Sequence, residues 1–147
     1  MIEMVIVLIV MAIMGTFIMS RATTGNDLIA QTEILKSHLR YAQIKAMNDT
    51  VPWGIRVPNA NSYILCKNNG IANDILPGET AQTHTLPATV TVTVTSGVGT
   101  TFNFNEWGTP VDAVGTAIVS LPTITLSQSQ GTTTNSITII KNTGYIN

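Results

Sequence analysis

The feature that most constrains this chain is its apolar N-terminus. Residues 1–19 are almost continuously apolar and contain one charged side chain, Glu3, while the next charge is Arg21. A helix needs about 20 apolar residues to span a bilayer, and this run meets that requirement. A cleaved signal peptide would have a basic start, a shorter apolar stretch and a small-residue cleavage site, and the run has none of these. The segment therefore predicts a retained helix.

Charge is scarce in the whole chain. Only 10% of the 147 residues are charged and the formal net charge is -1, whereas a soluble domain usually has about 25% charged residues. Part of the chain is therefore expected to lie outside water or inside an assembly. Beyond Lys67 there is one base, Lys141, against four acids. Because phosphate binding needs clustered bases, we do not expect a nucleic-acid partner.

Glu3 is the residue that does not fit a plain membrane anchor. An unpaired carboxylate within the membrane costs a few kcal/mol, about 2.5–3.5 at the helix centre. Two interpretations have equal weight from the residues alone. The carboxylate pairs with the terminal amine of a neighbouring chain in a staggered bundle of helices, or it lies at the bilayer interface in contact with water.

A second helical pattern follows the apolar run. Thr23, Thr24 and Gly25 have low helix propensity and indicate either a helix break or an ordinary kink or hinge. After them, apolar residues recur at spacings that keep them on one helix face: Leu28, Leu35, Leu39, Ala42 and Ala46. This pattern predicts an amphipathic helix that packs on a globular head and ends near residues 48–49, before Pro52.

From Pro52 onward the pattern changes to short alternating runs typical of strands. Residues 53–57 and 62–67 flank residues 58–61, which predicts a hairpin with a four-residue loop. Residues 68–82 are predicted to form a loop, and the strict Thr/Val alternation of residues 89–95 predicts a half-buried strand. Four more strands and one exposed turn, 128–135, complete the prediction: 101–104, 117–121, 123–126 and 136–140. The expected fold class is α+β, with one long helix across a small antiparallel head.

The sequence contains no recognisable catalytic or metal-binding constellation. His38 is expected to be solvated on the polar side of its helix, and no second ligand stands at the i+4 position. Cys66 lies in an apolar run and is expected in the core. Trp53 and Trp107 are expected to pack in the core or against turns. We therefore expect no enzymatic activity, no cofactor and no metal.

Four segments resemble a known family. Residues 2–13 resemble the N-terminal signature of type IV pilins and type II secretion pseudopilins, in which a lone glutamate opens a long Ile/Val/Leu helix. Two residues precede Glu3 here, whereas the family usually has four between the cleavage site and the glutamate. Residues 39–46, 102–110 and 137–146 are similar to segments of GspH/FimT-like pseudopilins, and they occur in the family's order.

The resemblance implies a pilin fold in three parts. Residues 1–22 would be the transmembrane and filament-core helix, residues 23–50 its amphipathic continuation and residues 51–147 the β-rich head. It also implies removal of a leader and methylation of the new N-terminus. The residues expected to mediate subunit assembly lie in the apolar helix: Ile2, Glu3, Val5, Leu8, Ile9 and Ala12. In pilin filaments the helix is often locally extended, and Thr23, Thr24 and Gly25 mark that place here.

The implied function is structural. The expected partners are further copies of the chain in a helical filament, the inner membrane before assembly, and the pilus or secretion assembly machinery. The expected location is the inner membrane for the precursor, and then a cell-surface filament or a periplasmic pseudopilus. An apolar helix kept whole is easier to explain if many copies pack together, which favours the main subunit. The alternatives are a minor tip pseudopilin of a type II secretion or DNA-uptake system, and a single-span anchored periplasmic binding domain.

Overall fold

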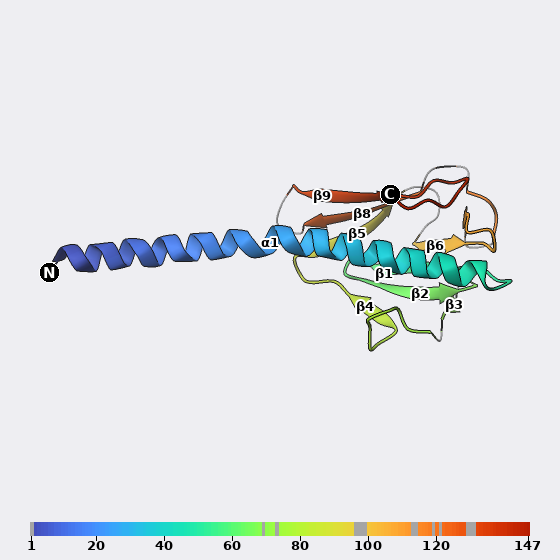
Figure 1. Ribbon diagram of the computed structural model, residues 1–147, viewed down its shortest axis with the longest axis horizontal. Coiled ribbons are helices and arrows are strands. Elements are labelled where there is room, and N and C mark those ends of the chain that lie inside the picture. Colours follow the sequence, from blue (N-terminus) through green and yellow to red (C-terminus); the bar gives the residue numbers. More distant parts are fainter. Residues whose placement is uncertain are drawn as a thin grey trace.

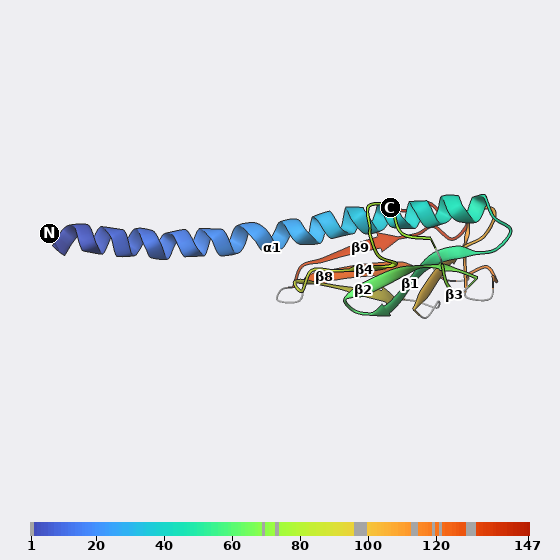
Figure 2. The ribbon, with the colours of Figure 1, turned by 90° about the horizontal axis from the view of Figure 1, so that it is seen from below.

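One long helix emerges from a β-rich head (Figure 1). The computed structural model describes residues 2–68, 70–72, 74–95, 100–112, 115–118, 120, 122–128 and 132–147, with the backbone alone for residues 15–26. Helix α1 (Ile2–Met47) has 46 residues, which corresponds to about 69 Å at 1.5 Å per residue. Its C-terminal half lies across the head and its N-terminal half projects away from it (Figures 1 and 2). The predicted α+β class is confirmed.

The helix continues without interruption through Thr23, Thr24 and Gly25, so the structure differs here from the predicted break. Glycine costs about 1 kcal/mol relative to alanine in a helix interior, and the threonines cost less. Helix formation is cooperative, so the stable helical turns on both sides carry the helix through these three residues of low propensity. A break at these residues inside a filament stays a prediction.

The second half of α1 is anchored by its apolar stripe. Leu28, Leu35, Leu39, Ala42 and Ala46 are each no more than 1% exposed, as their spacing predicted. They pack onto residues from both sheets in one core cluster, which includes Tyr63, Phe102, Phe104, Ile124, Leu126 and Ile137. Burial of a large apolar side chain contributes about 1.5–3 kcal/mol, so this stripe fixes the helix to the head.

Two antiparallel sheets lie beneath the helix (Figure 2). The six-stranded sheet has the order β3-β2-β1-β6-β7, with β4 also paired to β2. Its strands are β1 (Trp53–Asn59), β2 (Ser62–Lys67), β3 (Gly70–Ile71), β4 (Thr83–Thr85), β6 (Thr101–Phe104) and β7 (Pro110–Val111). The three-stranded sheet has the order β5-β8-β9. Its strands are β5 (Val90–Thr95), β8 (Thr123–Gln128) and β9 (Thr134–Thr138).

The first hairpin is tighter than predicted. Asn59 pairs with Ser62 across the β1–β2 ladder, so the loop consists of Ala60 and Asn61 rather than of four residues. The Asn59 side chain explains the difference, because its Oδ1 accepts hydrogen bonds from the Asn61 amide at 2.9 Å and from Ser62 Oγ at 3.0 Å. An irregularity in the register between Arg56 and Asn59 accommodates the extra strand length.

The other strand predictions have mixed outcomes. The alternating Thr/Val run forms β5, and its Val90 and Val92 are buried as predicted. The loop predicted for residues 68–82 contains β3. Residues 117–121 contribute an isolated bridge at Ala117, and residues 119 and 121 lie outside the described part. In the turn predicted for residues 128–135, the first residue and the last two belong to strands, and residues 129–131 lie outside the described part.

Candidate functional site

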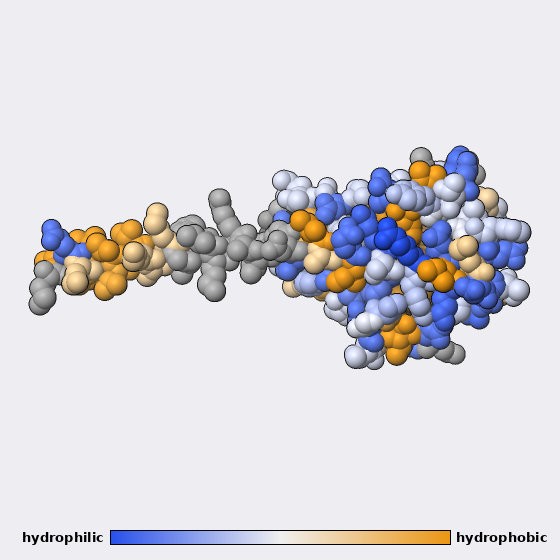
Figure 3. Space-filling view, viewed as in Figure 1, coloured by the Kyte–Doolittle hydropathy of each residue, from blue (hydrophilic) through white to orange (hydrophobic). Residues whose placement is uncertain are grey.

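The projecting part of α1 is an exposed apolar surface. Between residues 2 and 14, eleven large apolar side chains are 50–78% exposed, the extremes being Val10 and Ile2. We call residues 2–14 the apolar rod, and Figure 3 shows it extending away from the more polar head. A helix that is apolar on all sides is found buried, either in a large protein body or in a membrane. The described part of the chain provides no such cover for this segment.

The predicted assembly residues divide between two faces of the rod. Ile2, Val5, Leu8, Ile9 and Ala12 are spaced so that they share one face of a helix with 3.6 residues per turn. Glu3 lies about 100° around the helix axis from Ile2. The structure therefore brings five of the six residues together and sets Glu3 apart from them.

The face of Glu3 is otherwise apolar. Val7, Val10 and Met14 follow it at positions i+4, i+7 and i+11 on the same side of the helix. Glu3 is exposed, and no hydrogen-bond or ion-pair partner is recorded for it among the described residues, which do not include Met1. Its place in the first helical turn is favourable by about 0.3–1 kcal/mol, because the helix macrodipole attracts a negative charge there. A carboxylate on an apolar face is nonetheless costly once that face is covered.

The structure does not show the predicted membrane span. Within the part of the chain that is described, no helical stretch combines the length and the hydropathy that a bilayer crossing requires. Residues 15–26, which include the end of the predicted span, are described by backbone alone.

Three segments that are distant in the sequence meet at the far end of the head. The Gln43 side chain donates hydrogen bonds from Nε2 to the Gly108 carbonyl at 2.8 Å and to the Gly144 carbonyl at 3.0 Å. We call this arrangement the Gln43 clasp. Both glycines have positive φ, 71° and 66°, and a Cβ on Gly144 would lie 1.8 Å from the Gly108 carbonyl oxygen. The clasp joins residues 39–46 of α1 to residues 102–110 and 137–146 of the head, which are the three segments similar to GspH/FimT-like pseudopilins.

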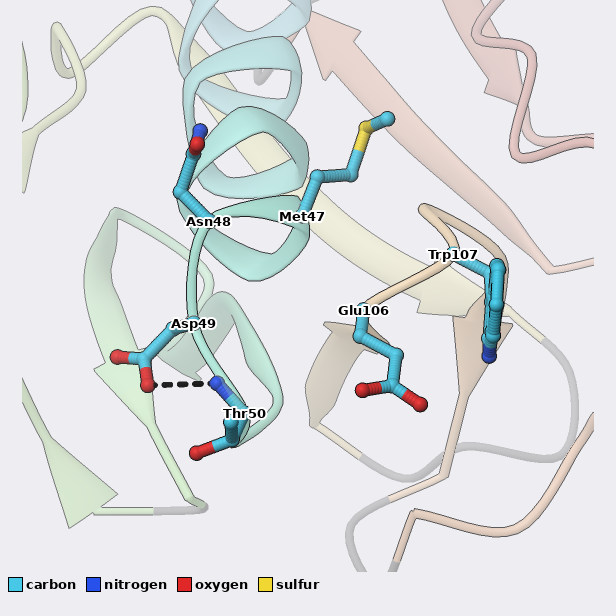
Figure 4. A pocket seen from close by; sticks show the side chains of 6 residues that line it. All are labelled: Met47, Asn48, Asp49, Thr50, Glu106 and Trp107. Atoms are coloured by element: carbon cyan, nitrogen blue, oxygen red, sulfur yellow. Dashed lines mark hydrogen bonds between the residues drawn. The ribbon is translucent and has the colours of Figure 1, made fainter.

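An open cleft of about 600 Å³ lies beside the clasp, between the end of α1 and the turn that follows β6 (Figure 4). Trp107 on its rim is 76% exposed, so the prediction that it packs in the core or against a turn was wrong. Asn105 holds this turn, because its Oδ1 accepts hydrogen bonds from the Trp107 amide and from the Thr109 amide and hydroxyl. The turn therefore presents the indole outward.

The opposite rim of the cleft carries a charge pair. Asp49 lies 2.7 Å from Lys67 Nζ and accepts a hydrogen bond from Trp53 Nε1 at 2.9 Å. The bond from Lys67, followed by that from Trp53, lowers the pKa of Asp49 to about 2. Trp53 is 5% exposed, which confirms the prediction for this tryptophan. Glu106 is the other carboxylate on the cleft, and no cluster of three or more potential metal ligands occurs among the described residues.

The two histidines, His38 on α1 and His84 on β4, lie together. His38 is 2% exposed, so the prediction of a solvated side chain was wrong. Its ring centroid is 5.6 Å from that of His84, and both rings contact Tyr63. The signal was present in the sequence, because His38 stands three residues after Leu35 and four before Ala42, at the edge of the buried stripe.

Cys66 is buried in the core as predicted. Its Sγ lies 3.2 Å from Asn103 Oδ1, which is also fully buried. Burial raises the pKa of the Cys66 thiol to about 12. Because the thiolate is the nucleophile, this cysteine is a packing residue.

No protein-family model and no curated protein sequence matches this chain. Its fold is similar to that of the type IV minor pilin FimU of Pseudomonas aeruginosa, with a TM-score of 0.59 and 20% identity over 85% of this chain and 90% of that one. A second crystal form of FimU gives a TM-score of 0.56 and 19% identity, covering 82% of this chain and 90% of that one.

The minor pseudopilin EpsH of the Vibrio cholerae type II secretion system has a TM-score of 0.61 and 10% identity, covering 82% of this chain and 94% of that one. The predicted pilin fold, with a long N-terminal helix on an antiparallel head, is therefore confirmed.

Proposed function

We propose that this chain is a structural subunit of a type IV pilus-like or pseudopilus filament, without catalytic activity, and that it polymerises through the projecting half of α1. The observation that carries the proposal is the exposed apolar surface of residues 2–14. The likeness of the head to FimU and EpsH supports it, since those proteins are a minor pilin and a minor pseudopilin.

Burial of the apolar rod is favourable in two successive environments, first the membrane and then a bundle of helices. Each large apolar side chain gains about 1.5–3 kcal/mol when it passes from full exposure to full burial. Because apolar side chains surround the helix, one neighbour covers only part of it. The hydrocarbon core of the inner membrane would cover all sides of a single precursor. A bundle of parallel helices from neighbouring subunits would cover all sides after assembly, in a surface filament or a periplasmic pseudopilus.

Glu3 would set the stagger of the bundle. On the face with Val7 and Val10, its carboxylate would become buried as neighbours pack. An unpaired buried charge costs several kcal/mol, so packing favours the position at which the terminal amine of an adjacent subunit reaches Glu3. The face of Ile2, Val5, Leu8, Ile9 and Ala12 would form apolar contacts without such a constraint.

The position of the subunit in the filament has two candidates. The exposed apolar rod favours a main subunit, because many copies packed together cover it completely. The likeness to FimU and EpsH, both described as minor subunits, supports a minor position equally well. The pilus or secretion assembly machinery would be the partner in either case.

Electron microscopy and quantitative mass spectrometry of the sheared surface fraction distinguish these positions. A main subunit would dominate regular filaments, whereas a minor subunit would be a trace beside another pilin. Absence from any filament, with the chain retained in the membrane, would refute the proposal and favour a single-span anchored domain. The N-terminal peptide would show whether residues precede Met1 and whether the terminus is methylated.

Replacement of Glu3 tests its role in register. Glu3→Ala and Glu3→Gln should remain in the membrane fraction but reduce filament yield strongly, because both remove the charge. Met4→Ala is the matched control, since it shortens a neighbouring side chain that is also exposed and keeps the carboxylate. A normal filament yield from both Glu3 variants would overturn the register mechanism.

A further inference from the structure

A polar aromatic cluster joins helix α1 to the edge of the larger sheet. His38 and Gln31 project from α1, Tyr63 from β2 and His84 from β4. The rings of Tyr63 and His84 stack with centroids 4.6 Å apart. His38, Tyr63 and His84 are 2%, 0% and 6% exposed. The cluster therefore lies in the contact between α1 and the three-residue strand β4.

The partners of His38 define its protonation state. Nε2 lies 3.0 Å from the Pro77 carbonyl oxygen, which can only accept, so Nε2 carries a hydrogen. Nδ1 lies 2.9 Å from the Tyr63 hydroxyl, the remaining partner of this ring. A neutral ring satisfies both contacts, because the Tyr63 hydroxyl donates to the bare Nδ1. A second proton would occupy Nδ1 and remove the acceptor of that hydroxyl.

His84 is a second ionisable ring beside His38. Its Nδ1 lies 2.6 Å from Glu79 Oε1, and its Nε2 lies 3.0 Å from Gln31 Oε1. When both of its ring nitrogens carry hydrogens, His84 donates to both of these oxygens. The titratable groups that face His38 are thus Tyr63 from β2, His84 from β4 and Glu79 from the preceding turn. Burial, followed by the positive charge of His84, lowers the pKa of His38, while the Pro77 carbonyl and Glu79 oppose that shift.

We propose that His38 is an acid-sensitive latch: uptake of a proton by this ring releases β4 and the turn of residues 76–79 from α1. The neutral ring binds the turn through Pro77 and the sheet through Tyr63. The protonated ring reverses the second hydrogen bond, leaves the Tyr63 hydroxyl hydrogen without this acceptor, and places a positive charge beside His84, at a ring separation of 5.6 Å. Because β4 has three residues and is paired to β2, this edge of the head yields before its centre does.

The stability of the closed latch depends on how many protons the closed and the opened states bind. Since the folded pKa is below the ordinary value of about 6.5, the opened state binds more protons than the closed state just below that pH. The latch is therefore intact above about pH 6.5 and weakens as the pH falls toward the folded pKa. One linked proton raises the opening constant by at most about tenfold per pH unit within this window.

Hydrogen-exchange mass spectrometry of the full chain in detergent, between pH 7.5 and pH 5, tests the latch. Rates are corrected for the pH dependence of intrinsic exchange, and residues 123–128 of β8 serve as the internal reference. In the wild type we expect residues 76–86 to lose protection as the pH falls while β8 stays protected. His38→Gln should abolish this pH dependence, because its amide donates to Pro77, accepts from Tyr63 and does not titrate in this range.

Tyr63→Phe provides an independent measurement should His38→Gln fail to fold. Loss of the hydroxyl leaves Nδ1 without a donor, so the neutral ring no longer binds the sheet and residues 76–86 should exchange faster than in the wild type already at pH 7.5. A wild type without pH-dependent protection at residues 76–86 would overturn the proposal. A parallel loss of protection in the wild type and in His38→Gln, or unchanged protection of residues 76–86 at pH 7.5 in Tyr63→Phe, would overturn it as well.

Discussion

The contribution of the Gln43 clasp to stability can be measured with an isosteric substitution. Gln43→Met keeps the length of the side chain and removes the amide that donates to the Gly108 and Gly144 carbonyls. Both glycines are buried, so water reaches the freed carbonyls poorly. A hydrogen bond contributes about 0.5–1.5 kcal/mol net, and an unsatisfied buried acceptor costs about 1–3 kcal/mol. We therefore expect Gln43→Met to lower the free energy of unfolding by about 2 kcal/mol.

Urea denaturation of the full chain in detergent, followed by Trp53 fluorescence in a Trp107→Phe background, is the assay. With an m-value of about 1–3 kcal/mol per molar urea, a loss of 2 kcal/mol lowers the midpoint by about 1 M. Arg40→Met is the matched control, because Arg40 lies one turn earlier on α1, is exposed and has no recorded partner among the described residues. A midpoint for Gln43→Met that equals the control midpoint would refute the assigned role of the clasp.

Two further predictions concern Cys66 and Gly54, which pair across strands β2 and β1 of the larger sheet. Cys66 should not react with a thiol reagent at pH 8 in the folded chain and should react fully in urea, because burial raises its pKa to about 12; rapid labelling of folded protein would contradict this. Gly54→Ala should prevent folding of the head, since a Cβ there would lie 1.8 Å from the Phe102 carbonyl oxygen in the paired strand β6. Circular dichroism of the purified variant checks it, and a native spectrum with an unchanged urea midpoint would show that the strands can separate enough to admit a methyl group.

The sequence predicts those features whose cause is local. The spacing of Leu28, Leu35 and Leu39 indicates the buried side of α1, because residues that share one face of a helix recur with a period of 3.6 in the sequence. The Thr/Val alternation predicts β5 for the same reason, since period two is the geometry of a strand. The lone glutamate in an apolar run indicates the pilin signature before any coordinate is known.

The remaining features depend on contacts that no local pattern encodes. Gln43 bonds residues 65 and 101 positions away, so its role follows from the tertiary structure alone. The spacing of His38 indicates the edge of the buried stripe, but the partners that make its burial favourable, the Tyr63 hydroxyl and the Pro77 carbonyl, come from distant segments. Strand β4 has three residues beyond a Pro- and Gly-containing segment, too few for a visible alternation. The role proposed for Glu3 involves a second chain and therefore lies outside the structure of one copy.

The Gln43 clasp also determines when this head can finish folding. A ribosome delivers Gln43 long before Gly144, which lies 101 positions later. Contacts between such distant positions form slowly, because the chain between them loses entropy when its ends meet. Until Gly144 has been synthesised, the last turns of α1 have no Gly144 carbonyl to hold. The clasp therefore forms late, after the strands that lie between Gln43 and Gly144.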